Sequence, residues 1–236
     1  MEMKLYCFRV GGIRFPGAED DLPIYAYLIE HPRGRVLVDT GESYPLRDGN
    51  AVMEESETIL PQLERLGYQP EDIGYVVLSH LHLDHAGYMS AFPKATFLVR
   101  KEELRAAWWP EPFELGYCLE NYAPTRDFKF IQPGPEEDYD LFGDGRIVLI
   151  DTSGHSRGHQ SVVLDLPHTG KAVLAVDAAP EKEILDRGYS GRPNVDSFRE
   201  ARSLQKLRHL ADCGYQVFYA HDPKHPHERL APDYYD

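Results

Sequence analysis

The most informative residues of this 236-residue chain are Val76-Val77-Leu78-Ser79-His80-Leu81-His82-Leu83-Asp84-His85-Ala86-Gly87. They begin as an apolar run without alternation, which favours a strand covered on both faces. Because successive side chains of an extended backbone alternate in direction, His80 and His82 should point the same way and could bind one metal ion. A following turn would let Asp84 and His85 face a second ion. The segment therefore predicts a buried strand that leads into a metal-binding loop.

The donor atoms of this loop indicate which metals it could hold. Neutral imidazole nitrogen and carboxylate oxygen suit zinc, and they also fit iron, cobalt or manganese. The alternative interpretation is a polar surface turn that happens to be rich in histidine. The whole chain has 11 histidines, so chance rarely gathers three of them with an aspartate at the end of one apolar strand. We therefore favour the metal site.

The pattern His-x-His-x-Asp-His after a strand resembles the signature of the metallo-β-lactamase superfamily. Three later segments agree with this resemblance. Residues 152–159 resemble the second metal turn of the family, residues 174–177 the strand that delivers a carboxylate to both metals, and residues 219–222 the strand end that supplies the last histidine. The resemblance implies an α/β fold, a four-layer αβ/βα sandwich that forms a single domain over residues 1–236. Two mixed sheets would pack face to face, with helices outside.

The resemblance also implies a ligand set for two divalent metal ions, with zinc as the expected metal. His80, His82 and His155 would hold one ion. Asp84, His85 and His221 would hold the other, and Asp177 would bridge the two.

Within the superfamily, the sequence is most similar to the N-acyl-homoserine lactonases and their relatives, including pyridoxolactonase. The matching stretches are residues 22–27, 36–41, 66–73, 79–87, 154–160, 177–178 and 221–222. This likeness implies a hydrolase that opens a lactone ring, foremost an N-acyl-homoserine lactone, by attack of a metal-bridging hydroxide. Asp84 would be the catalytic residue that carries a proton to the leaving alkoxide.

The chain departs from those lactonases at three places. Several of them have a tyrosine three residues after the bridging aspartate, at the position of Pro180, and this tyrosine touches the substrate carbonyl. Many have phenylalanine at the position of Leu83. The segment between Gly41 and Ile59, which binds substrate and forms the dimer in those enzymes, is short here.

Three alternative functions stay open at this point. Another hydrolase of the same fold, acting on a different lactone, an ester, a thioester, a phosphoester or a β-lactam, would use the same metals with a different pocket. A metallo-nuclease would need a basic groove, whereas the chain has a net charge of -14 and a pI near 5.2, which repels polyanions. A metal-binding protein without activity would tolerate the same ligands.

Composition and cysteine usage predict a soluble cytoplasmic protein. We find no secretory signal and no apolar run of the ~20 residues that cross a bilayer. Cys7, Cys118 and Cys213 are widely spaced and are expected to be reduced and packed as small hydrophobes. The expected partner is a small-molecule lactone, with no nucleic acid and no membrane, and a homodimer is left open.

Hydrophobic patterns predict the main strands and helices. The expected strands are residues 24–29, 35–38, 75–78, 96–99, 146–150, 161–166, 172–176 and 216–219. The expected helices are residues 56–66, 101–108 and 197–211. In the last helix, Ser197 and Glu200 would form a capping box, and Phe198 would lie on the apolar side. The long loop 110–135 is expected to serve as a lid or pocket wall.

Several other polar and aromatic residues have competing interpretations. His159 is expected to have a structural or hydrogen-bonding role beside a complete ligand set. Asp39 would either orient a ligand histidine or order the Asp-Thr-Gly turn. Trp108, Trp109 and Tyr117 would either wall an apolar pocket or pack on the core. Five histidines are expected to be solvated, namely His31, His168, His209, His225 and His227. The acidic run 136–138 is expected to be solvated as well.

Overall fold

The computed structural model describes residues 2–17, 20–46, 49–191 and 194–236. Seven strands form the first sheet in the order β4-β1-β2-β3-β5-β6-β7. Their bounds are β1 Lys4–Ile13, β2 Leu22–His31, β3 Gly34–Val38, β4 Ala51–Val52, β5 Tyr75–Val77, β6 Thr96–Leu98 and β7 Lys129–Ile131. The sheet is mixed, because β4, β1, β2 and β3 pair antiparallel whereas β3, β5, β6 and β7 pair parallel.

The second sheet is also mixed and has five strands in the order β12-β11-β10-β9-β8. Their bounds are β8 Tyr139–Asp140, β9 Ile147–Asp151, β10 Gln160–Leu166, β11 Gly170–Val176 and β12 Gln216–Tyr219. Strands β8 to β11 are antiparallel, and β12 joins β11 in parallel.

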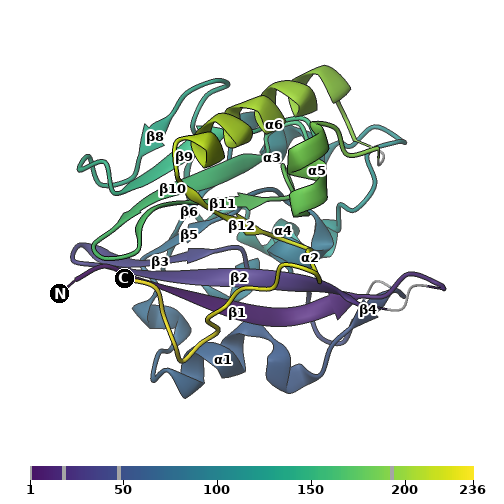
Figure 1. Ribbon diagram of the computed structural model, residues 1–236. Coiled ribbons are helices and arrows are strands. Elements are labelled where there is room, and N and C mark those ends of the chain that lie inside the picture. Colours follow the sequence, from purple (N-terminus) through teal and green to yellow (C-terminus); the bar gives the residue numbers. More distant parts are fainter. Residues whose placement is uncertain (1, 18–19, 47–48, 192–193) are drawn as a thin grey trace.

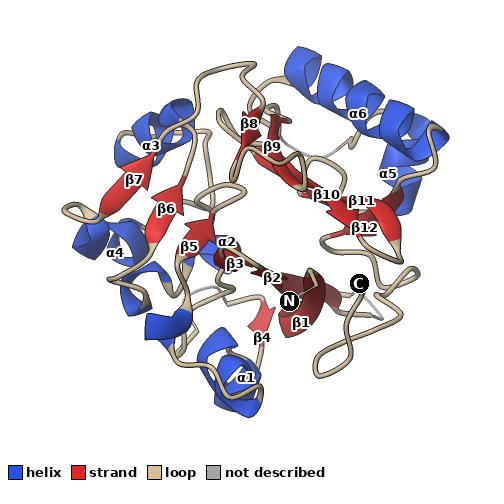
Figure 2. Ribbon diagram, turned by 90° about the vertical axis from the view of Figure 1, so that its left-hand side faces the viewer, coloured by secondary structure: helices blue, strands red, loops and turns tan. Residues whose placement is uncertain are grey.

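Helices cover the outer faces of both sheets (Figures 1 and 2). The α-helices are α1 Ile59–Arg65, α2 Leu83–Ala86, α3 Lys101–Trp108, α4 Leu119–Tyr122, α5 Lys182–Arg187 and α6 Ser197–Asp212. The short 3-10 turns are η1 Glu55–Glu57, η2 Pro70–Asp72, η3 Met89–Ala91 and η4 Ala123–Thr125. Helices α5 and α6 lie over the five-stranded sheet, and α1, α3 and α4 lie outside the seven-stranded sheet. The expected four-layer αβ/βα sandwich is confirmed.

Three apolar clusters hold these layers together. The first lies between the sheets and includes Val38 and Leu149, both fully buried. The second packs the seven-stranded sheet against its helices, with Phe97 at its centre. The third packs the five-stranded sheet against α5 and α6, where Leu204 and Leu207 are buried. Burying apolar surface on both faces of each sheet explains why the central strands are apolar without alternation.

The expected strands and helices are confirmed within one to three residues at most ends, but some local predictions were wrong. Four strands, β1, β4, β7 and β8, were not predicted. Helix α6 is capped by Asp196, whose carboxylate accepts from the N–H groups of Phe198 and Arg199, rather than by a Ser197–Glu200 box. Phe198 is 86% exposed and does not join the apolar side. An Asp at the N-cap accepts two free N–H groups at once, so it takes precedence over serine one residue later.

Two histidines expected in solvent are instead packed. His31 is 4% exposed, because the β2–β3 hairpin packs against the loop after β8, where its ring stacks on Phe142 and its Nε2 lies 3.1 Å from Asp144. His227 lies on the C-terminal segment, which folds back beside β2. Its ring centroid is 3.9 Å from that of Tyr25. Only the tertiary contacts of these segments cover the two rings, that of His31 almost fully and that of His227 in part.

The remaining predictions about exposed residues are confirmed only in part. His168, His209 and His225 are exposed as expected. All three cysteines are free, and Cys7 is buried, but Cys213 is exposed and is not packed as a small hydrophobe. In the part of the chain that the structure describes, no helix combines the length and apolar character that a membrane crossing needs.

Candidate metal centre

The candidate ligands converge at one end of the sandwich because of the strand directions. Strands β3 and β5 run parallel in one sheet, and β11 and β12 run parallel in the other. Loops that follow parallel strands share an edge, which is the usual place for a site in a fold of this kind. The loop after β5 carries His80 and His82, and the loop between β9 and β10 carries His155. Asp177 follows β11, and His221 follows β12.

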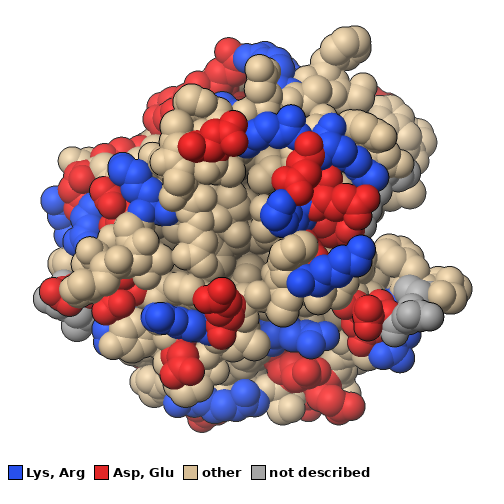
Figure 3. Space-filling view, viewed as in Figure 1, with Lys and Arg blue, Asp and Glu red and all other residues tan. Residues whose placement is uncertain are grey.

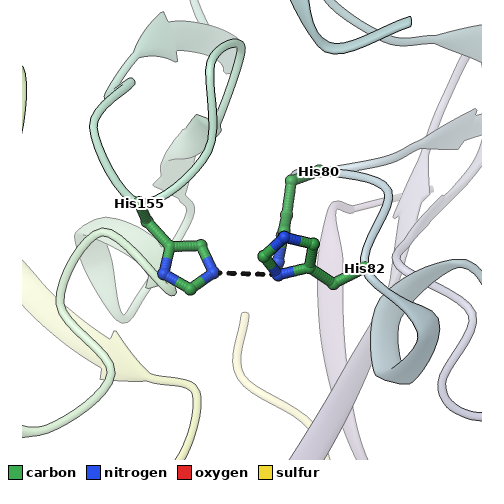
Figure 4. A group of neighbouring side chains, drawn as sticks. All are labelled: His80, His82 and His155. Carbon is green, nitrogen blue, oxygen red and sulfur yellow. Dashed lines mark hydrogen bonds between the residues drawn. The ribbon is translucent and has the colours of Figure 1, made fainter. Parts of the chain in front are cut away.

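Three histidines form the first group of donors. Ring nitrogens of His80, His82 and His155 lie within 4.8 Å of one another. Nε2 of His155 is 3.1 Å from Nδ1 of His82. In Figure 4 the rings of His80 and His82 come from one loop and face the ring of His155, which comes from the other sheet. The expected shared direction of His80 and His82 is therefore present.

The second group consists of Asp84, His85 and His221, whose donor atoms also lie within 4.8 Å of one another. Oδ2 of Asp84 is 3.3 Å from Nε2 of His85 and 3.6 Å from Nε2 of His221. Asp84 and His85 both lie on the single turn of α2, which begins directly after His82. This turn lets one short segment serve both groups.

Asp177 lies between the two groups and faces both. Its Oδ1 is 3.3 Å from Nε2 of His85 and 3.2 Å from Nε2 of His221. Its Oδ2 is 3.3 Å from Nε2 of His155. One carboxylate thus offers an oxygen to each group.

Hydrogen bonds at the far ring nitrogens aim three of these histidines into the site. His85 donates from Nδ1 to Oδ2 of Asp39 at 2.8 Å, and His221 donates from Nδ1 to the carbonyl of Pro23 at 2.7 Å. Nδ1 of His80 lies 3.0 Å from Oγ of Ser79, whose hydroxyl donates to Asp39. Donation from Nδ1 leaves Nε2 as a bare lone pair, which is the form that binds metal.

The donor set fits a pair of metal ions. Among the described residues, buried side-chain atoms without a hydrogen-bond partner include Nε2 of His80, Nε2 of His85 and Oδ1 of Asp177. Such atoms are costly to bury unless something satisfies them. Donor atoms of these three residues also lie within 4.8 Å of one another, across the two groups, so divalent cations would supply the missing partner.

Burial and the mixed charges of the site shift its pKa values. Burial lowers the pKa of His82 and of His155 to about 4, so both rings are neutral near pH 7. Burial alone would lower the pKa of His85 as well, but Asp84, Asp177 and Asp39 together raise it above its ordinary value. Burial opposes ionisation of Asp84, yet His85 and His221 lower its pKa to about 2. Asp84 is therefore ionised near pH 7, in the form that could bind a metal ion.

The loop over residues 110–118 reaches this centre. The N–H of Leu83 donates to the carbonyl of Gly116 at 2.8 Å, and His82 pairs with Tyr117 in an isolated β-bridge. A Cβ on Gly116 would lie 2.9 Å from Cγ of His82, and the φ of Gly116 is +95°, so only glycine suits this approach. The ring of Tyr117 packs 5.0 Å from that of His82. Part of the long loop 110–135, expected to be a lid or a pocket wall, thus packs against the segment that carries His82.

The aromatic pair beside this loop lies elsewhere. Trp108 is 40% exposed and lines a cavity of about 470 Å³ with Tyr122 and Phe130, away from the candidate ligands. Trp109 is 87% exposed. Residues 136–138 are exposed, as expected, although the backbone carbonyl of Glu137 accepts from the buried guanidinium of Arg100.

Three further residues lie close to the candidate ligands, and two of them contact the ligands or their loops. His159 is buried, and its Nδ1 lies 2.9 Å from Oγ1 of Thr152, while the donor groups described above do not include it. Sequence reasoning missed Pro23, which acts through its carbonyl and therefore leaves no side-chain signal. It also missed Glu103, a fully buried carboxylate on α3. Glutamate is common in the first turn of a helix, where it interacts favourably with the helix N-terminus, so nothing in the sequence indicated a second role for Glu103.

Fold and site together define a metallohydrolase-type sandwich with a histidine- and aspartate-rich centre. A model of the metallo-beta-lactamase superfamily matches residues 20–221, and the chain belongs to this superfamily. N-acyl homoserine lactonase AttM of Azorhizobium caulinodans is 34% identical over 261 residues, spanning 100% of this chain and 99% of AttM. N-acyl homoserine lactonase AiiA of Bacillus thuringiensis subsp. kurstaki is 31% identical over 238 residues, spanning 93% of this chain and 89% of AiiA.

Solved structures agree with these relatives. An N-acyl homoserine lactone hydrolase with the product N-hexanoyl-L-homoserine bound at its catalytic metal center superposes with a TM-score of 0.85. It is 29% identical, and the match covers 99% of each chain. A single-residue mutant of AiiA from B. thuringiensis, with N-decanoyl-L-homoserine bound at the active site, has the same TM-score and identity. The whole fold of the present chain is therefore that of the lactonases.

Proposed function

We propose that this protein is a dinuclear metal-dependent hydrolase that opens lactone rings, with N-acyl-homoserine lactones as the first candidate substrates. The observation that carries the proposal is the position of Asp177, whose two oxygens face different donor groups at 3.2 to 3.3 Å. The full-length similarity to lactonases supports the substrate class. The bound acyl-homoserine products of two relatives support a small-molecule partner.

We assign seven residues to the metals. His80, His82 and His155 would hold one ion, and Asp84, His85 and His221 the other, with Asp177 between them. Zinc is the metal we propose, because imidazole and carboxylate donors with open positions suit it. When bound, two such ions would lower the pKa of a water molecule to near neutrality and polarise the substrate carbonyl.

Hydrolysis of the lactone sets a task for one side chain. Water adds to the carbonyl carbon, the ring C–O bond breaks, and the leaving alkoxide takes up a proton. We propose that Asp84 transfers this proton. Its side chain is 15% exposed and ionised at neutral pH, so it can accept a proton from the attacking water. Its Oδ2 faces His85 and His221, leaving Oδ1 to pass the proton to the alkoxide.

A lactone panel tests the proposal directly. Zinc-loaded protein would be mixed with acyl-homoserine lactones, γ-lactones and δ-lactones, and acid release would be followed with a pH indicator. Each ring opening yields a hydroxy acid, so acidification must scale with enzyme and vanish in His82→Ala. Turnover of a thioester, phosphoester or β-lactam without any lactone turnover would replace this proposal with another hydrolase of the same fold.

Two further expectations about partners are kept as proposals. On the face in Figure 3, lysine and arginine side chains alternate with acidic ones rather than forming one basic stripe, which favours a small substrate over nucleic acid. A gel-shift experiment with RNA tests this point. The homodimer is tested by light scattering after size exclusion.

A further inference from the structure

Glu103 has an unusual position for a glutamate. It lies in the first turn of α3, outside both donor groups, and it is fully buried. Lone buried carboxylates are rare, because desolvation penalises the charge unless hydrogen bonds compensate. The reason for this buried charge must therefore lie in its contacts.

Each oxygen of Glu103 accepts from a different ligand loop. Oε1 accepts from the N–H of Leu81 at 3.0 Å, and Leu81 lies between the ligands His80 and His82. Oε2 accepts from the N–H of Gly158 and the hydroxyl of Ser156, both at the loop that carries His155, at 2.8 and 2.7 Å. One carboxylate thus ties a loop of the first sheet to a loop of the second.

A third segment joins the same carboxylate. The hydroxyl of Tyr117 donates to Oε1 at 3.0 Å, while the Tyr117 ring packs on His82. The pattern is symmetric, with one backbone N–H and one hydroxyl on each oxygen. All of the groups that face Glu103 are donors, so an ionised carboxylate fits and an amide does not.

The approach of the second loop is close enough to exclude a side chain. A Cβ on Gly158 would lie 2.5 Å from the backbone nitrogen of Glu103 and 2.7 Å from its Cβ. The loop that carries His155 therefore rests directly on α3 at Glu103. Its distance from the loop of His80 and His82 is set there.

The second donor group is held by other atoms. Asp39 orients His85, and the carbonyl of Pro23 orients His221. None of the four hydrogen bonds to Glu103 comes from Asp84, His85, His221 or their orienting partners. Glu103 thus contacts only the loops of the first group, whereas Asp39 contacts His85 directly and reaches His80 only through the hydroxyl of Ser79.

We propose that Glu103 is the positioning residue of the group His80, His82 and His155, and that it sets the affinity of this group for its metal ion without contacting the ion. The inference rests on the proposed metal centre. It concerns metal binding alone, so it is tested without substrate and stands or falls apart from lactone hydrolysis.

The first test is Glu103→Gln, which keeps the size of the side chain. Its NH₂ group must face the donors of one loop, so that loop loses its tie. Metal-free protein with ¹⁵N-labelled histidine would be titrated with zinc and followed by NMR of the ring nitrogens. The signals of His82 and His155 should need about 10- to 100-fold more zinc than in the parent protein. Those of His85 and His221 should respond at the zinc concentration of the parent.

A second variant covers the case in which Glu103→Gln does not fold. The pair Tyr117→Phe and Ser156→Ala removes one hydroxyl from each oxygen and keeps both backbone bonds. It should weaken the same group selectively, by less than Glu103→Gln. Glu102→Gln, on the same helix turn, is the matched control and should bind zinc as the parent does.

The outcomes separate a positioning role from a merely structural one. A lower melting temperature with unchanged zinc response at both groups would overturn the proposal. Equal loss at both groups would also overturn it, because it would show general loosening of the fold. Selective loss at His82 and His155 supports it.

Discussion

Asp39 accepts a hydrogen bond from His85, with Nδ1 of the histidine 2.8 Å from Oδ2 of the aspartate. The same carboxylate accepts from the N–H and the hydroxyl of Ser79 at 2.7 and 2.8 Å. Asp39 therefore orients a ligand histidine and also orders the chain after β3 and β5. The two interpretations left open by the sequence hold together.

Asp39→Asn should weaken the second metal group more than the first, because Asp39 contacts His85 directly and His80 only through Ser79. An NH₂ at the position of Oδ2 would face both His85 Nδ1–H and the Ser79 hydroxyl, and at the position of Oδ1 it would face the Ser79 N–H, so at least one hydrogen bond is lost. Zinc affinity at His85 and His221 should fall about 10- to 100-fold. The NMR titration described for Glu103 measures this affinity, and Asp140→Asn, in β8 of the five-stranded sheet, is the control. A loss confined to His82 and His155 would mean that the supports have been assigned the wrong way round.

Replacing a single candidate ligand should lower the metal content to an extent that depends on whether the residue faces one donor group or both. The parent protein should carry about two equivalents of divalent metal per chain. Asp177→Ala should lower the content and abolish turnover, because Asp177 faces both groups, and His82→Ala should empty the first. His168→Ala, at an exposed histidine, should change neither. Elemental analysis and the lactone assay measure this, and equal losses in all three variants would show that the site is misplaced.

Acid should destabilise the protein through His227. Burial lowers the pKa of His227 to about 3, below the ordinary 6.5. Between these values the unfolded chain binds a proton that the folded chain does not, so stability falls as pH drops from 6.5 toward 3. One such group contributes at most about 1.4 kcal/mol per pH unit.

His227→Gln should reduce this acid sensitivity. Glutamine keeps an acceptor for the hydroxyl of Tyr27, which lies 3.0 Å from Nε2 of His227, but it does not titrate. Urea denaturation at pH 7 and pH 5 would measure the loss of stability in each protein. His168→Gln is the exposed control. An identical loss in the parent and in His227→Gln would contradict the assignment.

The absence of a tyrosine at Pro180 should shape the substrate profile. The carbonyl of Pro180 accepts from the N–H of His221 at 2.9 Å. Pro180 therefore supports a candidate ligand and offers no hydrogen-bond donor to the substrate. Loss of an oxyanion donor commonly costs ~3 kcal/mol of transition-state stabilisation. We expect activity on many lactones with modest preference for long acyl chains. Kinetics over acyl chain length would measure it, and a steep rise of kcat/KM with length would contradict it.

Tyr88, directly after the metal-binding segment, and Tyr189, in the segment after Asp177, are two tyrosines that could replace that donor. The hydroxyl of Tyr88 accepts from the N–H of Tyr44 at 3.2 Å, and we take Tyr88 as the first candidate because its backbone lies beside the segment of His85. Its N–H donates to Oγ1 of Thr40, and Thr40 in turn donates to the carbonyl of the ligand His85. Tyr189 is 59% exposed, with the guanidinium of Arg187 over its ring. Tyr88→Phe should therefore lower kcat by about 10²- to 10³-fold, the cost of one oxyanion donor, whereas Tyr189→Phe should not. The reverse ranking would make Tyr189 the donor.

The sequence alone determined the class of fold, and it predicted the candidate ligands and the strands that precede them. Alternation along extended backbone aligned His80 with His82, and apolar strands before each histidine turn indicated two covered sheets. These are local properties, written within a few neighbouring residues. They were predictable for that reason.

Only the tertiary structure decided how distant loops are held together. The tie from Glu103 to Leu81 and Gly158, the bond from His221 to the carbonyl of Pro23, and the burial of His227 all join residues far apart in the chain. A backbone carbonyl or a glutamate in a helix turn has the same appearance in a sequence whether or not it supports a ligand. The packing of the two sheets brings these groups into contact, and that contact depends on the whole fold.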